Sequence, residues 1–476
     1  MLTVNSTFFR LAMDERYKDL SLYQLEGNMV DYLLHLSSPF IMHRVRTLRL
    51  RPYFMQQLQE AQVAGLLGEG LYNEIIRRLE NLLLNFTHLR ECHIAWYSND
   101  THLFHGVATQ SLLQKAISSS TRLRKLSLVL SLSKLEGLLT PDVRAATSDL
   151  DELEISILSD DGLELPCPPL EQVVVDSLIP FISRSQRHLT VFAFGASVPL
   201  DFSLLFHGLT NLPHLRLQHL SLSIPCTAPY LGTPHALSSF LNAHSQSLAR
   251  LALHGSHIEP SERRRGQARH PDLANWLEPS LLSCDDTNLS PSLEHLTFST
   301  SFLPIGTAIS CVRRYAHSPS FTSLDLTGRY MSYQQVKKLF SGTDNGATGT
   351  EMVLGVRKLR LGTVSLSPEL VDLMAEKLPK LEEVDMWIRD VRPHKNDVPV
   401  YDLSCTTTKG LAAMGRVKRQ VQVQIDWFRV EMQKRKGIYK NWTGVRHVAV
   451  WKFSGKMRIQ REYGKMIVEC LPLASH

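Results

Sequence analysis

The most regular feature of the chain is a short pattern of apolar residues, apolar-x-x-apolar-x-apolar, with mostly polar residues between them. Alternation of this kind is typical of a short strand that has one buried face. We therefore predict a strand in each copy of the pattern. The twelve copies begin at Val45, Leu89, Leu123, Leu150, Leu189, Leu217, Leu248, Leu293, Phe321, Val356, Leu381 and Val445.

The segments between the copies predict helices and turns. Amphipathic stretches precede several copies, as residues 370–378 do before Leu381. A proline stands two residues ahead of three copies, at Pro291, Pro319 and Pro379. Proline cannot continue a helix but readily opens the turn into a strand. A repeated unit of helix, break and short strand predicts a solenoid.

These repeats resemble leucine-rich repeats of the intracellular kind found in F-box proteins, over residues 45–390 and again near 445. The resemblance implies an α/β fold, a curved solenoid with short parallel strands on its concave face and helices outside. The chain departs from the family's template because its copies begin between 25 and 64 residues apart. The template's Asn or Cys after the third apolar position is also missing, with Ser131 and Leu158 among the residues in its place. Other contacts must then satisfy the polar groups of each turn.

Residues 4–17 carry a second resemblance, to the closing helix of an F-box, although an ordinary amphipathic helix is the alternative. The resemblance implies docking to a Skp-family adaptor through the residues in the apolar positions, which are Val4, Phe8, Phe9, Leu11 and Ala12. The first two F-box helices are absent from this chain, so we expect little or no adaptor binding unless a longer chain carries a complete F-box. Otherwise we expect the helix to pack on the first repeat near Val45 and Leu48.

Charge divides the chain into a mildly acidic body and a basic end. Residues 409–476 hold 15 Lys and Arg against 4 Asp and Glu, whereas the remainder holds 37 against 42. An apolar stripe from Leu411 to Met432 predicts a helix, and strand-like runs follow at 445–453, 457–460 and 466–470. We predict that this module caps the solenoid. Binding of nucleic acid or anionic lipid is the alternative.

The predicted organisation has three parts. Residues 1–40 hold the F-box remnant and a connecting helix, 41–400 the leucine-rich-repeat solenoid, and 401–476 the basic cap. Within the solenoid, residues 258–292 contain Ser261, three consecutive arginines, Pro271 and an Asp pair, and predict an inserted polar loop.

Composition and motifs narrow the function classes. No run of about 18 apolar residues could span a membrane, and charged residues near the N-terminus argue against a signal peptide. The seven cysteines are at least 27 residues apart, which excludes a Cys-x-x-Cys pair and fits a reducing compartment. We expect a soluble, monomeric protein of the cytoplasm or nucleus. No phosphate-binding loop, His-Glu-x-x-His or Gly-x-Ser-x-Gly motif occurs, and we expect no enzymatic activity, cofactor or metal.

Polar residues that alternate with the apolar ones should line the concave face, where a protein target would bind. The candidate binding residues are Glu152, Glu154, Asp325, Lys358, Arg360, Glu383, Asp385 and Trp387. Opposite charges beside a large aromatic side chain favour the copies around 358–387 as the central contact. The alternative is that these side chains are merely solvated.

The resemblance implies a substrate-recognition subunit of an SCF-type cullin-RING ubiquitin ligase, or a degenerate relative that lacks a complete F-box. A free-standing leucine-rich-repeat scaffold is a second hypothesis. A nucleic-acid-associated protein that uses the basic C-terminal module is a third.

Overall fold

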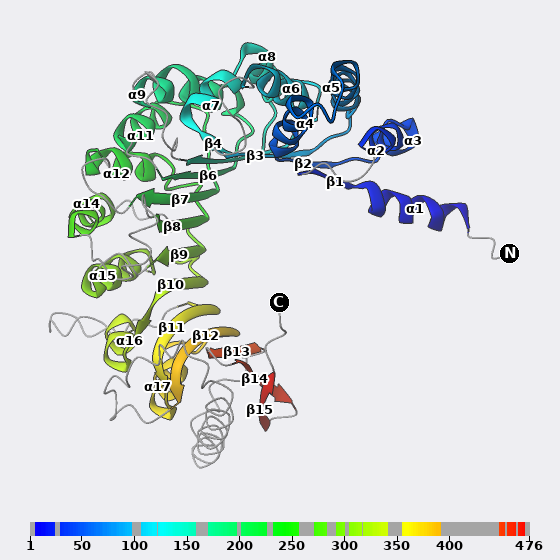
Figure 1. Cartoon of the computed structure of the whole chain (residues 1–476). Helices are drawn as coiled ribbons and strands as arrows, with labels where there is room; N and C mark the ends of the chain where they lie inside the picture. Colours follow the sequence, from blue (N-terminus) through cyan, green and yellow to red (C-terminus); the bar gives the residue numbers. More distant parts are fainter. Residues whose placement is uncertain are drawn as a thin grey trace. The chain divides into compact units, whose positions relative to one another are not determined.

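The computed structural model of the chain contains two compact units, residues 1–248 with 255–266, and residues 249–254 with 267–476 (Figure 1). Each unit is described by itself. The structure describes residues 5–23, 29–97, 106–120, 122–158, 170–197, 201–225, 232–256, 271–282, 292–299, 304–316, 318–340, 355–391, 447–452, 455–462 and 465–471.

Seven described strands of the first unit lie side by side in chain order, each parallel to the next. Equivalent apolar positions of neighbouring strands are register partners: Leu48 is paired with Cys92, and Cys92 with Leu126. The strands are β1 (Asp19–Leu22), β2 (Thr47–Leu50), β3 (Glu91–Trp96), β4 (Lys125–Ser131), β5 (Glu152–Leu158), β6 (Val191–Ala196) and β7 (His219–Pro225).

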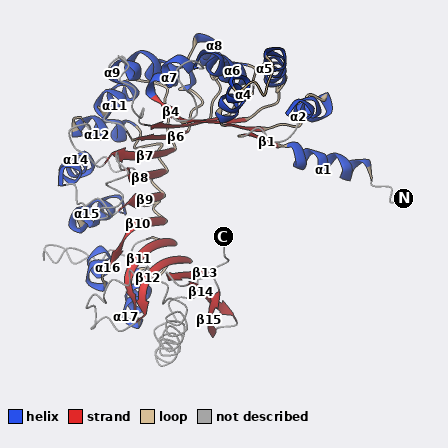
Figure 2. Ribbon diagram, in the orientation of Figure 1, coloured by secondary structure: helices blue, strands red, loops and turns tan. Residues whose placement is uncertain are grey.

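Helices α4 to α12 lie on one side of these strands (Figure 2). Along β3, Cys92, Ile94 and Trp96 are buried while Glu91 and His93 are partly exposed, so the side away from the helices forms an uncovered face. The helical segments are α1 (Ser6–Tyr17), α2 (Met29–Leu36), α3 (Pro39–Met42), α4 (Tyr53–Val63), α5 (Glu69–Leu84), α6 (Gly106–Ser118), α7 (Leu132–Leu138), α8 (Pro141–Ala146), α9 (Leu170–Val173), the π-helical turn η2 (Val174–Leu178), α10 (Ile179–Ser185), α11 (Phe202–Thr210) and α12 (Pro234–Ala243).

The second unit repeats this arrangement and ends differently. Its parallel strands are β8 (Arg250–Ser256, of which 250–254 belong here), β9 (His295–Ser299), β10 (Ser323–Met331), β11 (Lys358–Leu366), β12 (Glu383–Val391) and β13 (His447–Lys452). The last two strands, β14 (Gly455–Glu462) and β15 (Lys465–Leu471), are antiparallel to their neighbours. The helices are α14 (Pro271–Leu282), α15 (Ile305–Ala316), α16 (Tyr333–Phe340) and α17 (Pro368–Lys377).

All twelve predicted strands are confirmed, and each begins two residues after the first apolar residue of its copy. The open α/β class, with parallel strands and covering helices, is confirmed with them. The strand-like runs near 457 and 466 are also confirmed, as β14 and β15. The predicted helix from Leu411 to Met432 lies outside the described residues.

The prediction of an inserted polar loop over residues 258–292 is wrong for residues 271–282, because these residues form α14. Trp276, Leu277 and Leu281 of this helix are buried, at 5%, 4% and 0% exposure. Apolar residues with this spacing lie on one side of a helix, and their burial stabilises it despite Pro279 inside it.

Serine side chains supply contacts that tie successive copies together. Ser120 Oγ donates to the carbonyl oxygen of Leu89 at 2.8 Å, and Ser318 Oγ donates to that of Leu293 at 3.0 Å. In both cases the acceptor is the first apolar residue of the preceding copy. These hydrogen bonds satisfy carbonyl groups of buried residues.

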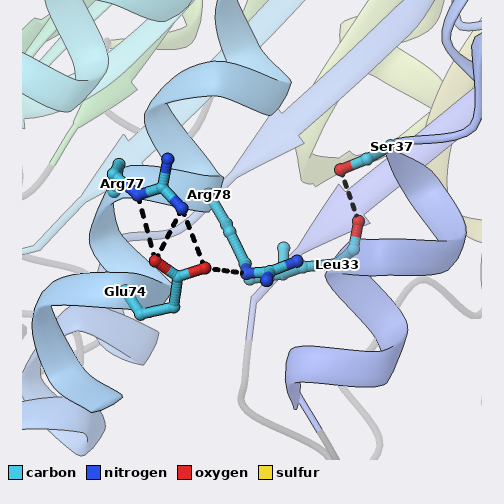
Figure 3. A network of polar contacts seen from close by, with 5 residues as sticks. All are labelled: Leu33, Ser37, Glu74, Arg77 and Arg78. Carbon is cyan, nitrogen blue, oxygen red and sulfur yellow. Dashed lines mark hydrogen bonds and ion pairs between the residues drawn. The ribbon is translucent and has the colours of Figure 1, made fainter. Parts of the chain in front are cut away.

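Other polar contacts on the helix side of the first unit are local. Glu74 of α5 accepts hydrogen bonds from Arg77 at 2.9 Å and from Arg78, and Ser37 Oγ donates to the carbonyl of Leu33 at 2.6 Å (Figure 3). The hydrogen bonds from Arg77 and then Arg78 lower the pKa of the Glu74 carboxyl. Each contact joins residues three or four positions apart, so this group stabilises its own helices.

Helix α1 forms as predicted, and Asn5 caps it by accepting from the Thr7 N–H at 2.9 Å. No residue of α1 is buried, so the expected packing on the first repeat is wrong. The helix instead contacts α3, where the rings of Phe9 and Phe40 stack with centroids 6.3 Å apart. Of the predicted adaptor-docking residues, Val4 lies outside the described residues, and those left exposed are Phe8 (69%), Phe9 (48%), Leu11 (59%) and Ala12.

A charged candidate binding site on the second unit

Six of the eight predicted target-binding residues come together on β10, β11 and β12. The parallel register places Lys358 opposite Glu383, and Arg360 opposite both Asp325 and Asp385. β10 and β12 are separated in the sequence by the whole repeat that contains β11. The pairing of both strands with β11 brings their residues together. Trp387 stands opposite Gly362, two residues beyond Asp385 along β12 and therefore on the same face.

Ion pairs join these side chains into two neighbouring groups, Lys358 with Glu383 and Arg360 with two carboxylates. We call the two groups together the charged ladder: Asp325, Lys358, Arg360, Glu383 and Asp385. Lys358 Nζ lies 3.0 Å from Glu383 Oε2. Arg360 bridges two carboxylates, with Nη1 3.3 Å from Asp325 Oδ2 and Nε 3.4 Å from Asp385 Oδ2. The Arg360 group therefore spans β10, β11 and β12, and the pair of Lys358 with Glu383 lies beside it on β11 and β12.

Trp387 extends the ladder with an aromatic surface. The guanidinium carbon of Arg360 lies 4.8 Å from the centroid of the indole ring, within cation–π range. Trp387 is partly exposed. Two carboxylates and an aromatic ring thus hold the planar guanidinium in one orientation, which fixes the shape of the surface around it.

The ladder surrounds a hollow of about 230 Å³ in the uncovered face. His295 and Ser323 complete its polar lining, and Leu324, Leu359 and Val384 also line it. Pockets for drug-sized molecules measure about 300–1,000 Å³. The smaller hollow suits a side chain presented by a partner.

Negative charge exceeds positive charge in the hollow. Burial raises the pKa of the Asp325 carboxyl above its ordinary value, although Arg360 opposes the shift. The Asp325 side chain is 15% exposed, and its Oδ1 has no hydrogen-bond partner among the described residues. Burial also lowers the pKa of His254, against the influence of Asp325, so this neighbouring imidazole is neutral at pH 7. The arrangement favours a positively charged group of a ligand.

Glu152 and Glu154 lie on β5 of the first unit and form a separate group. Both pair with Lys125 of β4, at 3.0 and 2.9 Å. Burial would raise the pKa of Glu154, but the hydrogen bond and charge of Lys125 hold it below its ordinary value. The sequence-based set omitted Lys125, and also His295 of the second unit. Both lie two residues after the first apolar residue of their copies, the same offset that selected Glu152 and Lys358.

Not every polar strand position is available on the uncovered face. Thr47 and Ser323, at the offset expected to face outward, are only 4% and 8% exposed. The alternation of polar and apolar residues therefore predicts the face on which a side chain lies better than it predicts the exposure of that side chain. Neighbouring strands shield the small side chains.

The described residues show no arrangement typical of metal or thiol chemistry. Among them, no three His, Cys, Asp or Glu side chains are placed to hold a metal ion. Burial raises the pKa of the Cys92 and Cys311 thiols to about 12, which keeps both protonated and unreactive. In the same part of the chain, no helix has the length and apolar character needed to cross a membrane.

Comparison with known proteins gives no assignment: no protein-family model matches the chain, and no curated protein matches it significantly.

Proposed function

We propose that the protein is an interaction module that captures a protein target on the uncovered face of its second unit. As the resemblance to F-box proteins with leucine-rich repeats implies, it serves as a substrate-recognition subunit of an SCF-type ubiquitin ligase, or is a degenerate relative without a complete F-box. It presents its target without catalysis of its own, in the cytoplasm or nucleus. The observation that carries the proposal is the charged ladder around one hollow, with Trp387 beside Arg360 of that ladder.

The energetics of the ladder favour recognition over stability. Lys358 and Glu383 are 58% and 48% exposed, and Arg360 is 48% exposed. Solvent-exposed ion pairs contribute only about 0.2–1 kcal/mol each to folding. Arg and Trp side chains are, in contrast, enriched among the few residues that dominate binding energy at protein interfaces.

The adaptor half of the proposal concerns α1. Phe8 and Leu11 are 69% and 59% exposed, and an adaptor could cover them. Burial of apolar surface contributes about 25 cal/mol per Å², so a helix face with several large apolar side chains favours association.

Affinity purification of the full chain, with partners identified by mass spectrometry, tests the proposal. We expect a protein partner that is lost on combining Asp385→Ala with Trp387→Ala. Glu376→Ala is the matched control, since Glu376 is 66% exposed on the covering helix α17. Retention of the same partner by the double variant would contradict the proposal.

The same experiment separates the alternatives. A Skp-family adaptor that is recovered by the wild type and lost on combining Phe8→Ala with Leu11→Ala supports the ligase subunit. A target without any adaptor supports a free-standing scaffold. Recovery of nucleic acid with steep salt dependence, and no protein target, supports the nucleic-acid hypothesis.

A further inference from the structure

Three successive copies of the repeat in the first unit carry a basic residue on each side of their first apolar residue. The segments are 44–46 (Arg-Val-Arg), 88–90 (His-Leu-Arg) and 122–124 (Arg-Leu-Arg), and they lead directly into β2, β3 and β4. The next copy reverses the charge, since 149–151 reads Asp-Leu-Asp before β5. The parallel register of the four strands therefore places these segments in a row along the edge where the strands begin.

The basic residues at the two ends of this row have acidic partners. Arg124 Nη1 lies 3.4 Å from Asp151 Oδ1 of the next copy, and Arg44 Nε lies 3.0 Å from Asp14 Oδ1 of α1. Arg124 and Asp151 occupy the same position of neighbouring copies, so side chains at this position reach the adjacent copy. Opposite charges at such positions attract each other, and like charges repel.

The basic residues in the middle of the row form no ion pair with any residue in the described part of the chain. We call them the basic edge: Arg46, His88, Arg90 and Arg122. Arg90 and Arg122 are exposed, whereas Arg46 and His88 are partly exposed. The backbone N–H of Arg90 donates to the carbonyl of Arg46 at 2.7 Å, and Arg46 Nη1 donates to the carbonyl of His88 at 3.2 Å. Folding thus holds three arginines in adjacent copies without a carboxylate between them.

The pKa of His88 reports the positive potential of the basic edge. Burial lowers this pKa, and the charges of Arg46, Arg122 and His43 lower it further. The ring of His43 lies edge-on to that of His88, with centroids 5.6 Å apart. Because like charges close together repel each other, the arrangement contributes nothing favourable to folding by itself. A bound anion would remove the repulsion.

We propose that the basic edge binds a short acidic segment of a partner protein. Each guanidinium can donate two parallel hydrogen bonds to a carboxylate. Strands of a sheet lie about 4.8 Å apart, so the three copies span roughly 10 Å, and alternate residues of an extended peptide lie about 7 Å apart. Two or three acidic side chains of one segment can therefore reach the three arginines. The basic edge belongs to the first unit and the charged ladder to the second, and the inference does not rest on the proposed function.

The ends of the row favour an acidic peptide over nucleic acid. Surfaces that bind single-stranded nucleic acid follow its backbone over several nucleotides and stack its bases on aromatic side chains. Here the ion pairs of Arg44 and Arg124 close the row on both sides. Asp149, which follows Arg124 in the next copy, is 59% exposed and would repel a phosphate backbone that continued along the row. A short acidic segment needs only the basic edge itself.

The test measures binding of a fluorescent polyglutamate peptide to the full chain by anisotropy at low salt, with polyglutamine as the uncharged control peptide. We expect binding of polyglutamate only, weakened at least about tenfold by combining Arg90→Gln with Arg122→Gln, because charge-assisted hydrogen bonds are lost. The matched control combines Arg184→Gln with Arg216→Gln, which removes the same charge from exposed positions of the first unit outside the basic edge. It should bind within about twofold of the wild type, because only screened long-range attraction is lost.

The melting temperature of Arg90→Gln with Arg122→Gln separates loss of binding from loss of folding. Both side chains are exposed, and their replacement relieves repulsion between like charges, so this variant should melt at or above the temperature of the wild type. Several results would overturn the inference: no binding of polyglutamate, equal weakening in the two double variants, a lowered melting temperature of the Arg90 and Arg122 variant, or tighter binding of oligothymidylate that depends on these two arginines.

Discussion

His244 makes the stability of the first unit sensitive to mild acid. The side chain is 4% exposed, and its ring packs edge-on against Phe240 with centroids 4.7 Å apart. Neither ring nitrogen has a hydrogen-bond partner among the described residues. Burial lowers the pKa of His244 from 6.5 to about 4, because the charged imidazolium would lose its hydration without gaining a partner.

The pKa shift gives the sign and size of the effect. Between pH 6.5 and 4 the unfolded chain binds a proton at this residue and the folded unit does not, so stability falls as the pH is lowered through that range. The full shift corresponds to about 3 kcal/mol at 1.36 kcal/mol per pKa unit. On the same basis, lowering the pH from 7 to 5 should cost about 2 kcal/mol of unfolding free energy.

Chemical denaturation of the wild type and His244→Phe at both pH values measures this cost. The phenylalanine variant should lose about 2 kcal/mol less than the wild type on acidification, because it has no proton to bind. His188→Gln is the control, since His188 is 50% exposed in the same unit, and it should follow the wild type. Equal losses in the wild type and His244→Phe would refute the reasoning.

Three further predictions concern the core, the inter-repeat contacts and the ladder. Leu324→Ala should destabilise the second unit by about 2–5 kcal/mol in chemical denaturation, since Leu324 is 1% exposed on β10; a loss below about 1 kcal/mol would show that the repeat is not packed as described. Ser120→Ala should cost about 1–3 kcal/mol by leaving the Leu89 carbonyl without its partner, and an unchanged unfolding midpoint would argue against that hydrogen bond. Because the pKa of Asp325 is raised by burial, the folded unit binds a proton there more tightly than the unfolded chain, and the wild type should lose stability relative to Asp325→Asn as the pH rises from about 3.8 through the folded pKa. If the unfolding free energies of the wild type and Asp325→Asn differ by the same amount at every pH from about 3.5 to 7, roughly the range in which carboxyls titrate, this prediction is contradicted.

The sequence predicted the strands well because burial alternates with a period of two, and the eleven copies whose burial is described carry the same three buried positions. It missed β1, although Tyr17, Leu20 and Leu22 fit the pattern, because Tyr17 also completes the amphipathic run of α1. It missed α14 because prolines and charged residues around it outweighed its apolar positions. Local signals compete at such places, and tertiary packing decides between them.

The sequence predicted which residues form the charged ladder, but it did not predict the contacts between them. The spacing within each copy placed Arg360, Asp385 and Trp387 on the same face, and the structure brings them together. The bridge from Arg360 to Asp325 depends on the register between β10 and β11 across a long connection, which the sequence does not encode locally. Burial of Asp325, and hence the direction of its pKa shift, depends on the packing of several strands at once.

Site-specific photo-crosslinking tests the central claim, target capture on the charged ladder, most directly. A photoreactive amino acid is placed at Lys358 on the uncovered face or at Lys337, which is exposed on the covering helix α16. We predict a crosslinked protein partner from position 358 that disappears when Asp385→Ala and Trp387→Ala are added, and none from position 337. A partner crosslinked from position 337 and not from 358 would contradict the account.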